Sequence, residues 1–285
     1  MASRPGVSIR EMVPADIPAG LRLCRASHWN QTDRDWEHFL TAAPGNALVA
    51  VEQGVVVGTV AALPYGSFTW ISMVLVDPSV RGRGFGTTLL TRGLELVPRE
   101  STARLDATPA GEVIYRKLDF VPEYGLSRLF LDSRPTGVTR GSSVRPLESS
   151  DWPALLEMDL RAFGASRASL LERLAAESPG SAWVVEDHGR LRGYLMGRHG
   201  HLRDQIGPLV ADSSETARVL LDAVLASRTR DEIFIDVPDH QHEFRERLVQ
   251  LGFAMERPFL RMYRGRLATP GTPSLVYAIT GPEFG

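Results

Sequence analysis

The chain has 285 residues, of which 43% are hydrophobic and 8% aromatic, so it can bury a core for one large domain or two ordinary ones. Its formal net charge of -2, without a block of basic residues, excludes nucleic acid as an expected partner. Cys24 has no second cysteine to pair with, and neither a secretion signal nor an apolar run near ~18 residues is present, so we expect a cytoplasmic protein without a membrane partner.

The first 133 residues predict a mixed α/β domain. In chain order the pattern is a strand, two helices, a hairpin around Gly54, a strand, a helix, another strand, a helix and a closing strand. Alternating apolar residues predict strands at 55–63 and 71–76. The helical stripe that follows consists of Leu89, Leu90, Gly93, Leu94 and Val97.

A second copy of this pattern follows the first. Residues 8–21 recur as 143–156, and residues 47–58 recur as 182–193, both at the same offset. A shared offset indicates an internal duplication. The segment 134–142 is polar and rich in Gly, Pro and Ser, which predicts a linker. We therefore expect two tandem domains, 1–133 and 143–285, each with a central mixed, mostly antiparallel sheet flanked by helices.

The most informative motif spans 74–90, where an apolar strand runs through a glycine-rich turn into a helix. Gly82, Gly84 and Gly86 permit positive φ and close approach of a ligand, and free N–H groups at a helix start attract an anion. The Gly-Lys-Ser/Thr ending of a Walker loop is missing, and Leu89 stands where a dinucleotide fingerprint needs its third glycine. The motif predicts a diphosphate site; an ordinary strand-to-helix turn is the alternative.

The spacing Arg81-x-x-Gly84-x-Gly86 after V-x-V-D-P resembles motif A of the GNAT acetyltransferases. The resemblance implies acetyl-CoA as co-substrate, with its pyrophosphate on the loop and a strand-edge N–H near Val74 to Val76 that polarises the thioester. The cofactor-binding residues that it implies are Val74, Leu75, Val76, Arg81, Gly82, Arg83, Gly84, Phe85, Gly86 and Thr87. The W-N-Q-T segment at 29–32, D-V-P at 236–238 and G-P-E-F-G at 281–285 resemble a two-domain GNAT subgroup.

The second copy lacks the glycine loop. Its equivalent segment, 208–221, has no glycine, and Asp212 and Glu215 would repel a pyrophosphate. We expect one CoA per chain, in the first GNAT-like domain. The degenerate second domain is expected to cover the sheet edge or close over the acceptor. Because two such domains imitate a homodimer of single-domain relatives, a monomer is plausible.

Tyr115 is the candidate proton donor. Its place on a helix before Leu118-Asp119-Phe120 resembles that of the GNAT tyrosine whose phenol protonates the CoA sulfur, although Asp119 stands where the family usually has glycine. Its counterpart in the second copy is Leu248, so the phenol is absent together with the loop. An aromatic ring half-buried against the sheet is the alternative.

Asp106 is the candidate general base or amine anchor. It ends the strand beside the motif-A strand, where open α/β sheets expose ligand-facing side chains. Its counterpart Asp236 is retained in the second copy, which favours a structural role such as capping the next helix. A chain of water molecules is the alternative proton acceptor.

The acceptor pocket is expected at the first two helices and the hairpin before the motif-A strand, as the GNAT resemblance implies. The aromatic and polar candidates there are Trp29, Asn30, Gln31, Tyr65 and Trp70. Trp29 could instead join Trp36 on one core-facing helix stripe. The histidine pairs at 199 and 201 and at 240 and 242 lack a third ligand, so we expect no metal.

These features predict an N-acetyltransferase that moves an acetyl group from acetyl-CoA to a primary amine of a small molecule. Three alternatives stay open: a non-catalytic CoA-binding sensor, a mycothiol-synthase-like enzyme and a protein N-acetyltransferase. The second is weakened because catalysis in such enzymes runs in the second half, which here lacks the loop.

Overall fold

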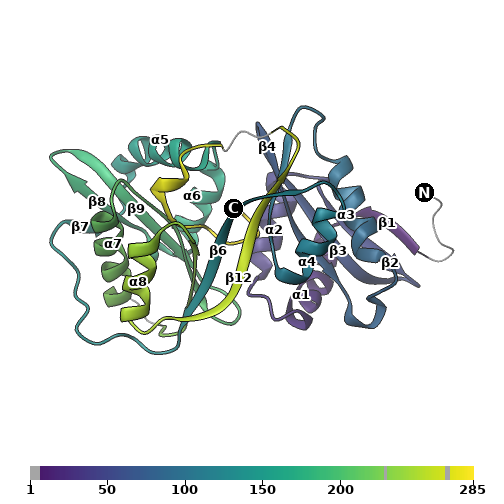
Figure 1. Ribbon diagram of the computed structural model, residues 1–285, viewed down its shortest axis with the longest axis horizontal. Coiled ribbons are helices and arrows are strands. Elements are labelled where there is room, and N and C mark those ends of the chain that lie inside the picture. The colour runs from purple at the N-terminus through teal and green to yellow at the C-terminus, as the bar shows by residue number, and fades with distance from the viewer. Residues whose placement is uncertain (1–6, 228–229, 267–269) are drawn as a thin grey trace.

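The computed structural model describes residues 7–227, 230–266 and 270–285, which form two halves lying side by side (Figure 1). The first half has its elements in the order that the sequence predicts: β1 (Val7–Glu11), α1 (Ile17–Ala26), α2 (Asp33–Ala42), β2 (Ala47–Glu52), β3 (Val55–Tyr65), β4 (Phe68–Val76), α3 (Phe85–Glu95), β5 (Thr102–Ala107), α4 (Pro109–Arg116) and β6 (Val121–Leu131). The second half contains β7 (Val144–Pro146), α5 (Trp152–Phe163), α6 (Ala168–Glu177), β8 (Trp183–Asp187), β9 (Arg190–Arg198), β10 (Asp204–Ala211), α7 (Ser214–Ser227), β11 (Ile233–Pro238), α8 (His242–Gln250), β12 (Ala254–Arg264) and a further strand, β13 (Val276–Ala278).

The duplication is visible in matching contacts. Arg10 holds both carboxylate oxygens of Asp16 at 2.6 and 2.8 Å, and Arg145 holds those of Asp151 at 2.7 and 2.8 Å. In both halves this ion pair fixes the start of the first helix against the first strand. The repeat in the sequence therefore corresponds to a repeat in the structure.

The strands form a sheet that is mixed and mostly antiparallel, as predicted. Within the described residues its order is β1-β2-β3-β4-β5-β12-β6-β11-β10-β9-β8-β7, with β13 paired to β10. Parallel pairing joins β4 to β5 and β10 to β11. The order is nearly symmetrical about its centre, so the two halves meet through strand pairing as well as side-chain packing.

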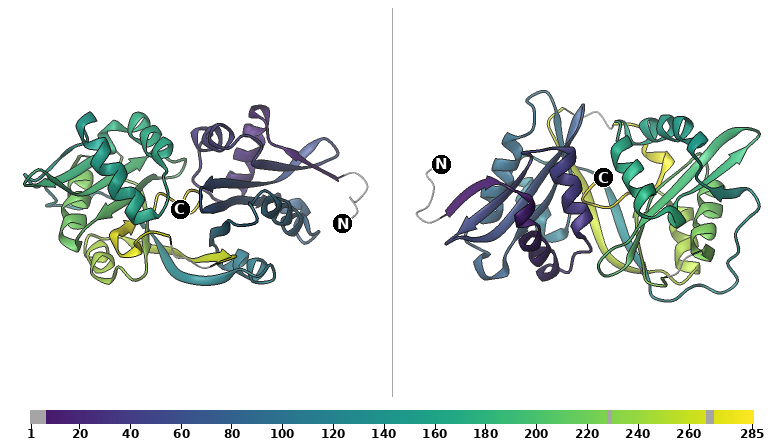
Figure 2. Two further views of the ribbon diagram at one scale, coloured as in Figure 1. Left: turned by 90° about the horizontal axis from the view of Figure 1, so that it is seen from above. Right: turned by 180° about the vertical axis from the view of Figure 1, so that it is seen from behind.

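The closing strands of the two halves are exchanged, which the sequence did not predict. Strand β12 of the second half lies between β5 and β6 of the first, and β6 in turn pairs with β11 of the second. Both strands run as long curved arrows between the halves, and Figure 2 shows the same crossing from above and from behind. The predicted linker at 134–142 separates the two halves along the sequence. In space, however, the sheet of each half is completed by a strand from the other half.

Two buried ion pairs tie the exchanged strands to their new neighbours. Arg261 on β12 donates to both oxygens of Asp106 on β5, at 2.8 and 2.9 Å. Arg128 on β6 donates to both oxygens of Asp236 on β11, at 2.7 and 2.8 Å. Because bidentate pairing fixes the relative position of both groups, each pair specifies the register of an exchanged strand.

The core is continuous between the halves. One buried cluster contains side chains from both, among them Trp36, Phe39, Phe163 and Phe284. Phe39 stacks on Phe284 with ring centroids 5.1 Å apart, and Tyr65 meets Phe163 edge to face at 5.0 Å. The halves therefore share one apolar interior, which holds them in a fixed relation.

We predict that residues 1–133 do not fold alone, because β5 and β6 would both lose β12 as a neighbour and become open sheet edges. Thermal unfolding followed by circular dichroism should show no cooperative transition for this fragment, and co-expression with 134–285 should restore one. A cooperative transition of the isolated fragment near that of the full chain would contradict the prediction.

Candidate functional site

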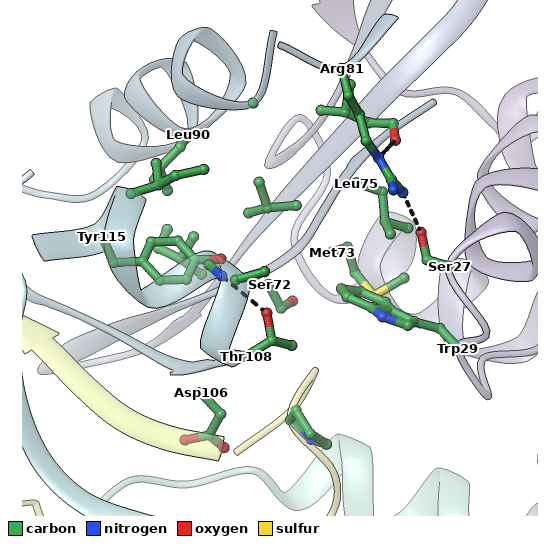
Figure 3. A pocket seen from close by; sticks show the side chains of 18 of the residues that line it. Ser27, Trp29, Ser72, Met73, Leu75, Arg81, Leu90, Asp106, Thr108 and Tyr115 are labelled. Carbon is green, nitrogen blue, oxygen red and sulfur yellow. Dashed lines mark hydrogen bonds between the residues drawn. The ribbon is translucent and has the colours of Figure 1, made fainter. Parts of the chain in front are cut away.

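A cavity of about 930 Å³ opens where β4 and β5 diverge (Figure 3). Its size lies in the range of small-molecule and cofactor sites. The residues that line it are 26–29, 31, 71–76, 80–82, 84–87, 90, 106, 108–111, 114–115, 128, 257, 259 and 282–283. The first half contributes most of the wall, and the exchanged strand β12 and the C-terminal tail complete it.

The divergence of β4 from β5 exposes one edge of β4 to the cavity. The two strands pair only from Phe68 to Trp70 and from Thr102 to Arg104, after which β5 continues beside β12. A register shift against β3 accompanies a positive φ of 54° at Met73, whose carbonyl oxygen accepts a 2.7 Å hydrogen bond from Thr59 Oγ1. Such a bulge redirects the backbone and is common beside functional sites.

The glycine-rich turn forms the cavity wall next to this edge. Gly82 and Gly84 have φ values of 76° and 85°, and Gly84 is the residue before α3. The first helical bond after it runs from Thr88 N to Gly84 O at 3.0 Å, so the N–H groups of Phe85, Gly86 and Thr87 precede it. These donors at a helix start suit a diphosphate.

Asp77 anchors the entrance to the turn. Its carboxylate accepts from Ser79 N at 3.0 Å and Ser79 Oγ at 2.7 Å, and it pairs with Arg22. Ser79 and Arg22 lower the pKa of Asp77 to about 2, so the carboxylate is charged at neutral pH. These contacts fix the end of β4 where the glycine-rich turn begins.

All the predicted cofactor-binding residues except Arg83 line the cavity. Arg81 lies on the wall, with its Nε 3.2 Å from Val76 O and a terminal nitrogen 3.4 Å from Ser27 Oγ (Figure 3). Arg83 instead pairs with Glu52, with one N–O distance of 3.1 Å. We therefore leave Arg83 out of the proposed cofactor site.

Tyr115 is held over the N-terminus of α4. Thr108 caps this helix by accepting from Gly111 N at 3.2 Å, and Pro109 occupies the first helical position. The ring packs on Gly111, where a Cβ would lie 2.8 Å from Tyr115 Cε2. Gly111 thus leaves the space that the phenol needs.

The hydroxyl of Tyr115 has no hydrogen-bond partner within the described ranges, and the side chain lines the cavity (Figure 3). Burial raises the pKa of Tyr115 to about 12, so the phenol is neutral and able to donate at physiological pH. After the helix, Asp119 adopts φ 64° and its counterpart Gly252 adopts φ 94°. The left-handed turn is retained because Asp tolerates this conformation better than most residues.

Asp106 lines the cavity but has both oxygens on Arg261, and its side chain is fully buried. Burial raises the pKa of Asp106, and the Arg261 guanidinium opposes that rise. To accept a substrate proton the carboxylate would have to give up part of this ion pair. The matching pair of Asp236 with Arg128 favours the structural interpretation.

The predicted acceptor residues divide into two groups. Trp29 and Gln31 line the cavity. Asn30 bonds to the backbone of Leu202 and Arg203, Tyr65 donates to Phe284 O at 3.0 Å, and Trp70 donates to Pro282 O at 2.9 Å. Because the polar atoms of these last three join the two halves, we leave them out of the proposed acceptor site.

Several lining residues were missed at the sequence level. They are Ser72, Arg128, Arg257, Phe259, Pro282 and Glu283. Most reach the cavity only through the strand exchange or the tail, which no local pattern reveals. The one sequence signal for any of them was an acidic residue, Glu283, within the short apolar motif G-P-E-F-G.

In the second half, the place equivalent to this cavity is filled by the chain itself. Strands β10 and β11 pair only from Asp204 to Ile206 and from Ile233 to Ile235, after which β13 pairs with Leu209 and Val210 of β10. At the start of α7, Thr216 donates to Asp212, which also pairs with Arg192 at 2.7 Å. This half thus lacks both the glycine turn and an open strand edge.

No three His, Cys, Asp or Glu side chains in the described ranges group as a metal site. No helix among those residues combines the length and apolar character needed to cross a bilayer.

Each half of the chain matches a known family model. Residues 19–133 match the model of the acetyltransferase (GNAT) family, and residues 155–278 match that of an acetyltransferase (GNAT) domain. The chain is similar to the Uncharacterized N-acetyltransferase YitH of Bacillus subtilis (strain 168), at 24% identity over 70% of this chain and 71% of the relative.

Two solved structures share the fold over nearly the whole chain. A Pyrococcus horikoshii protein assigned as an acetyltransferase aligns at 26% identity with a TM-score of 0.83, covering 100% of this chain and 98% of its own. A tandem GNAT protein from the clavulanic acid biosynthesis pathway aligns at 17% identity with a TM-score of 0.67, covering 92% and 100%. The second similarity concerns the fold alone.

We predict that Asp106→Asn and Asp236→Asn destabilise the protein alike, each by about 3–5 kcal/mol, because each leaves a buried arginine without its carboxylate. Urea unfolding measures this loss. If Asp106 has only the structural role, the fraction that stays folded should keep similar acetyl-transfer rates in both variants. A loss of turnover confined to Asp106→Asn, at unchanged stability, would instead identify it as the base.

Proposed function

Because this chain belongs to the GNAT acetyltransferase family, we propose that it transfers an acetyl group from acetyl-CoA to a primary amine of a small molecule. The observation that carries the proposal is that one cavity contains the glycine turn, the free edge of β4 and the Tyr115 side chain. The second half supports it by completing the cavity wall rather than by providing a second turn.

The proposed reaction assigns a role to each part of the wall. The N–H groups of Phe85, Gly86 and Thr87 bind the pyrophosphate, and the edge of β4 between 71 and 76 lies beside the pantetheine arm. An amine nitrogen attacks the thioester carbon, so that a C–N bond forms and the C–S bond breaks. The nitrogen loses a proton to water, the departing thiolate gains one from the Tyr115 hydroxyl, and the phenolate that remains takes a proton back from solvent.

A small acceptor agrees with the mixed apolar and polar lining of the cavity. Trp29, Met73 and Phe259 supply apolar surface, while Gln31 and Glu283 supply polar atoms. Apolar walls with a few polar groups are typical of small-molecule pockets. The C-terminal tail and β12 add Arg257, Phe259, Pro282 and Glu283 to the wall.

Gly84→Glu should abolish acetyl-CoA binding, because it places an anion at the diphosphate site and a side chain at φ 85°. We expect affinity to fall by at least ~100-fold, measured by calorimetry and by thiol release. Gly54→Glu is the matched control, since Gly54 has φ 81° and open space but lies in a hairpin outside the cavity wall. Unchanged binding in Gly84→Glu would refute the cofactor site.

Tyr115→Phe should keep acetyl-CoA affinity and lower kcat by about 10²–10⁴-fold, the usual contribution of a positioned acid. Since the pKa of Tyr115 is raised to about 12, the wild-type rate should show no loss from phenol ionisation between pH 7 and 10. Pre-steady-state thiol release across this range measures both effects. Full turnover in Tyr115→Phe would contradict the donor role, and lost turnover with intact binding separates an enzyme from a CoA sensor.

A further inference from the structure

Two arginines on the exchanged strands line the cavity. Arg128 on β6 lies opposite Arg257 on β12 in the register of these strands, which run side by side between the halves (Figure 1). Both guanidinium groups pack near the ring of Phe259, another lining residue, with their Cζ atoms 5.2 and 5.9 Å from its centroid. The strand exchange thus brings two cations to one part of the cavity wall.

The guanidinium of Arg128 is held in one position. Its Nε and Nη2 donate to the carboxylate of Asp236 at 2.7 and 2.8 Å, and its Cζ lies 5.0 Å from the ring centroid of Phe234. The side chain is only 6% exposed. The remaining nitrogen, Nη1, has no hydrogen-bond partner within the described ranges, yet it is not shielded from solvent. A buried and oriented side chain of the cavity wall therefore has two unused N–H donors.

The internal repeat shows what Arg128 lacks. The equivalent residue, Arg261 on β12, holds Asp106 through the same two nitrogens and lies opposite Tyr124 on β6. There Nη1 donates to the Tyr124 hydroxyl at 2.7 Å, so each guanidinium nitrogen has a partner. Tyr124 and Arg257 occupy matching places, each directly after a bulge in its strand. At the cavity, a second cation thus stands where the repeat has the oxygen that accepts from Nη1.

Arg257 has unused donors as well. Its Nη2 lies 3.2 Å from Glu256 Oε1, and no other hydrogen bond of this guanidinium occurs in the part of the chain that the structure describes. Like charges directly opposite each other on antiparallel strands are destabilising. An anion bound by both Arg128 and Arg257 would relieve that repulsion and use their free N–H groups.

The carboxylates around the cavity do not provide this anion. Asp236 and Glu256, which pair with the two arginines, are not lining residues. Asp106 lines the wall but has both oxygens on an arginine outside it. Glu283 also lines the wall, but one oxygen pairs with an arginine outside it and the other is shielded from solvent. The charged atoms that this part of the wall offers to the cavity are therefore N–H donors.

These donors suit a carboxylate. Each of its two oxygens can accept from one guanidinium. Because each arginine keeps its own carboxylate partner, the excess positive charge is small, which favours one negative charge over the nearly two of a phosphate. The coenzyme's pyrophosphate has a separate proposed site at the glycine turn, so the carboxylate belongs to another part of the bound substrates.

We propose that Arg128 and Arg257 bind a carboxylate of the acceptor, so that the substrate is an amine that also carries a carboxylate, such as an amino acid. The inference rests on the proposed acetyl transfer. One carboxylate oxygen takes the place at Arg128 Nη1 that the Tyr124 hydroxyl has at the equivalent arginine. Arg257 holds the other oxygen and thereby selects acceptors with this group.

The test measures thiol release from acetyl-CoA with acceptors that differ by one carboxylate: L-phenylalanine against 2-phenylethylamine, and 4-aminobutanoate against propylamine. At least one amino acid should have a kcat/KM about tenfold or more above that of its analogue. Arg257→Gln should raise the KM for that amino acid by a similar factor and leave acetyl-CoA affinity unchanged. Arg264→Gln is the matched control and should keep the preference, since Arg264 is an exposed arginine of the same strand outside the cavity wall.

Thermal unfolding checks that both variants fold, and a measurement on the wild type covers the case in which Arg257→Gln does not. The acid that lacks only the amine, 3-phenylpropanoate or butanoate, should inhibit competitively against the accepted amino acid, and the corresponding alcohol should not. Equal inhibition by acid and alcohol would overturn the carboxylate site.

Three further results would also overturn it: equal kcat/KM within both acceptor pairs, an unchanged KM in folded Arg257→Gln, or no acetylation of either amino acid. A rate with succinyl-CoA above that with acetyl-CoA, lost in Arg257→Gln, would assign the carboxylate to the acyl group and contradict its place on the acceptor. Acetyl transfer itself stands if only the amines without a carboxylate react. The acetyl-CoA site fails separately, through absent binding to the wild type or intact binding to Gly84→Glu.

Discussion

The exchange of β6 and β12 between the halves is the constraint on which the rest of the structure depends. It inserts β12 beside β5 and fixes it there through Arg261 and Asp106, while Arg128 and Asp236 fix β6 beside β11. Because β12 continues the sheet next to β5, β4 is free to diverge, and the cavity opens between them. The same exchange brings Arg257 and Phe259 into the wall.

A duplicated chain has thereby become structurally asymmetric. The first half retains a glycine turn and an open strand edge, and the second half fills the equivalent edge with β13. The residues after β13 continue into the tail that carries Glu283 to the first half's cavity. The second half therefore contributes lining residues to the cavity of the first, and its role in closing over the acceptor stays a prediction.

The sequence predicted the features that depend on interactions between neighbouring residues. Positive φ at Gly82 and Gly84 and the strand-turn-helix around them depend on residues close in the chain. The strand exchange depends on pairing between β5 and β12, which lie far apart in sequence, so no periodicity encodes it. For that reason local patterns do not show that Tyr65, Trp70 and Asn30 bond across the two halves. Nor do they show that Glu283 lines the cavity.

The most direct test of the account is a crystal structure of the intact chain grown with acetyl-CoA in excess. We expect one coenzyme per chain, with its pyrophosphate against the N–H groups of Phe85, Gly86 and Thr87, its thioester beside β4, and the Tyr115 hydroxyl near its sulfur. Coenzyme bound in the second half, or a pyrophosphate away from the glycine turn, would contradict it.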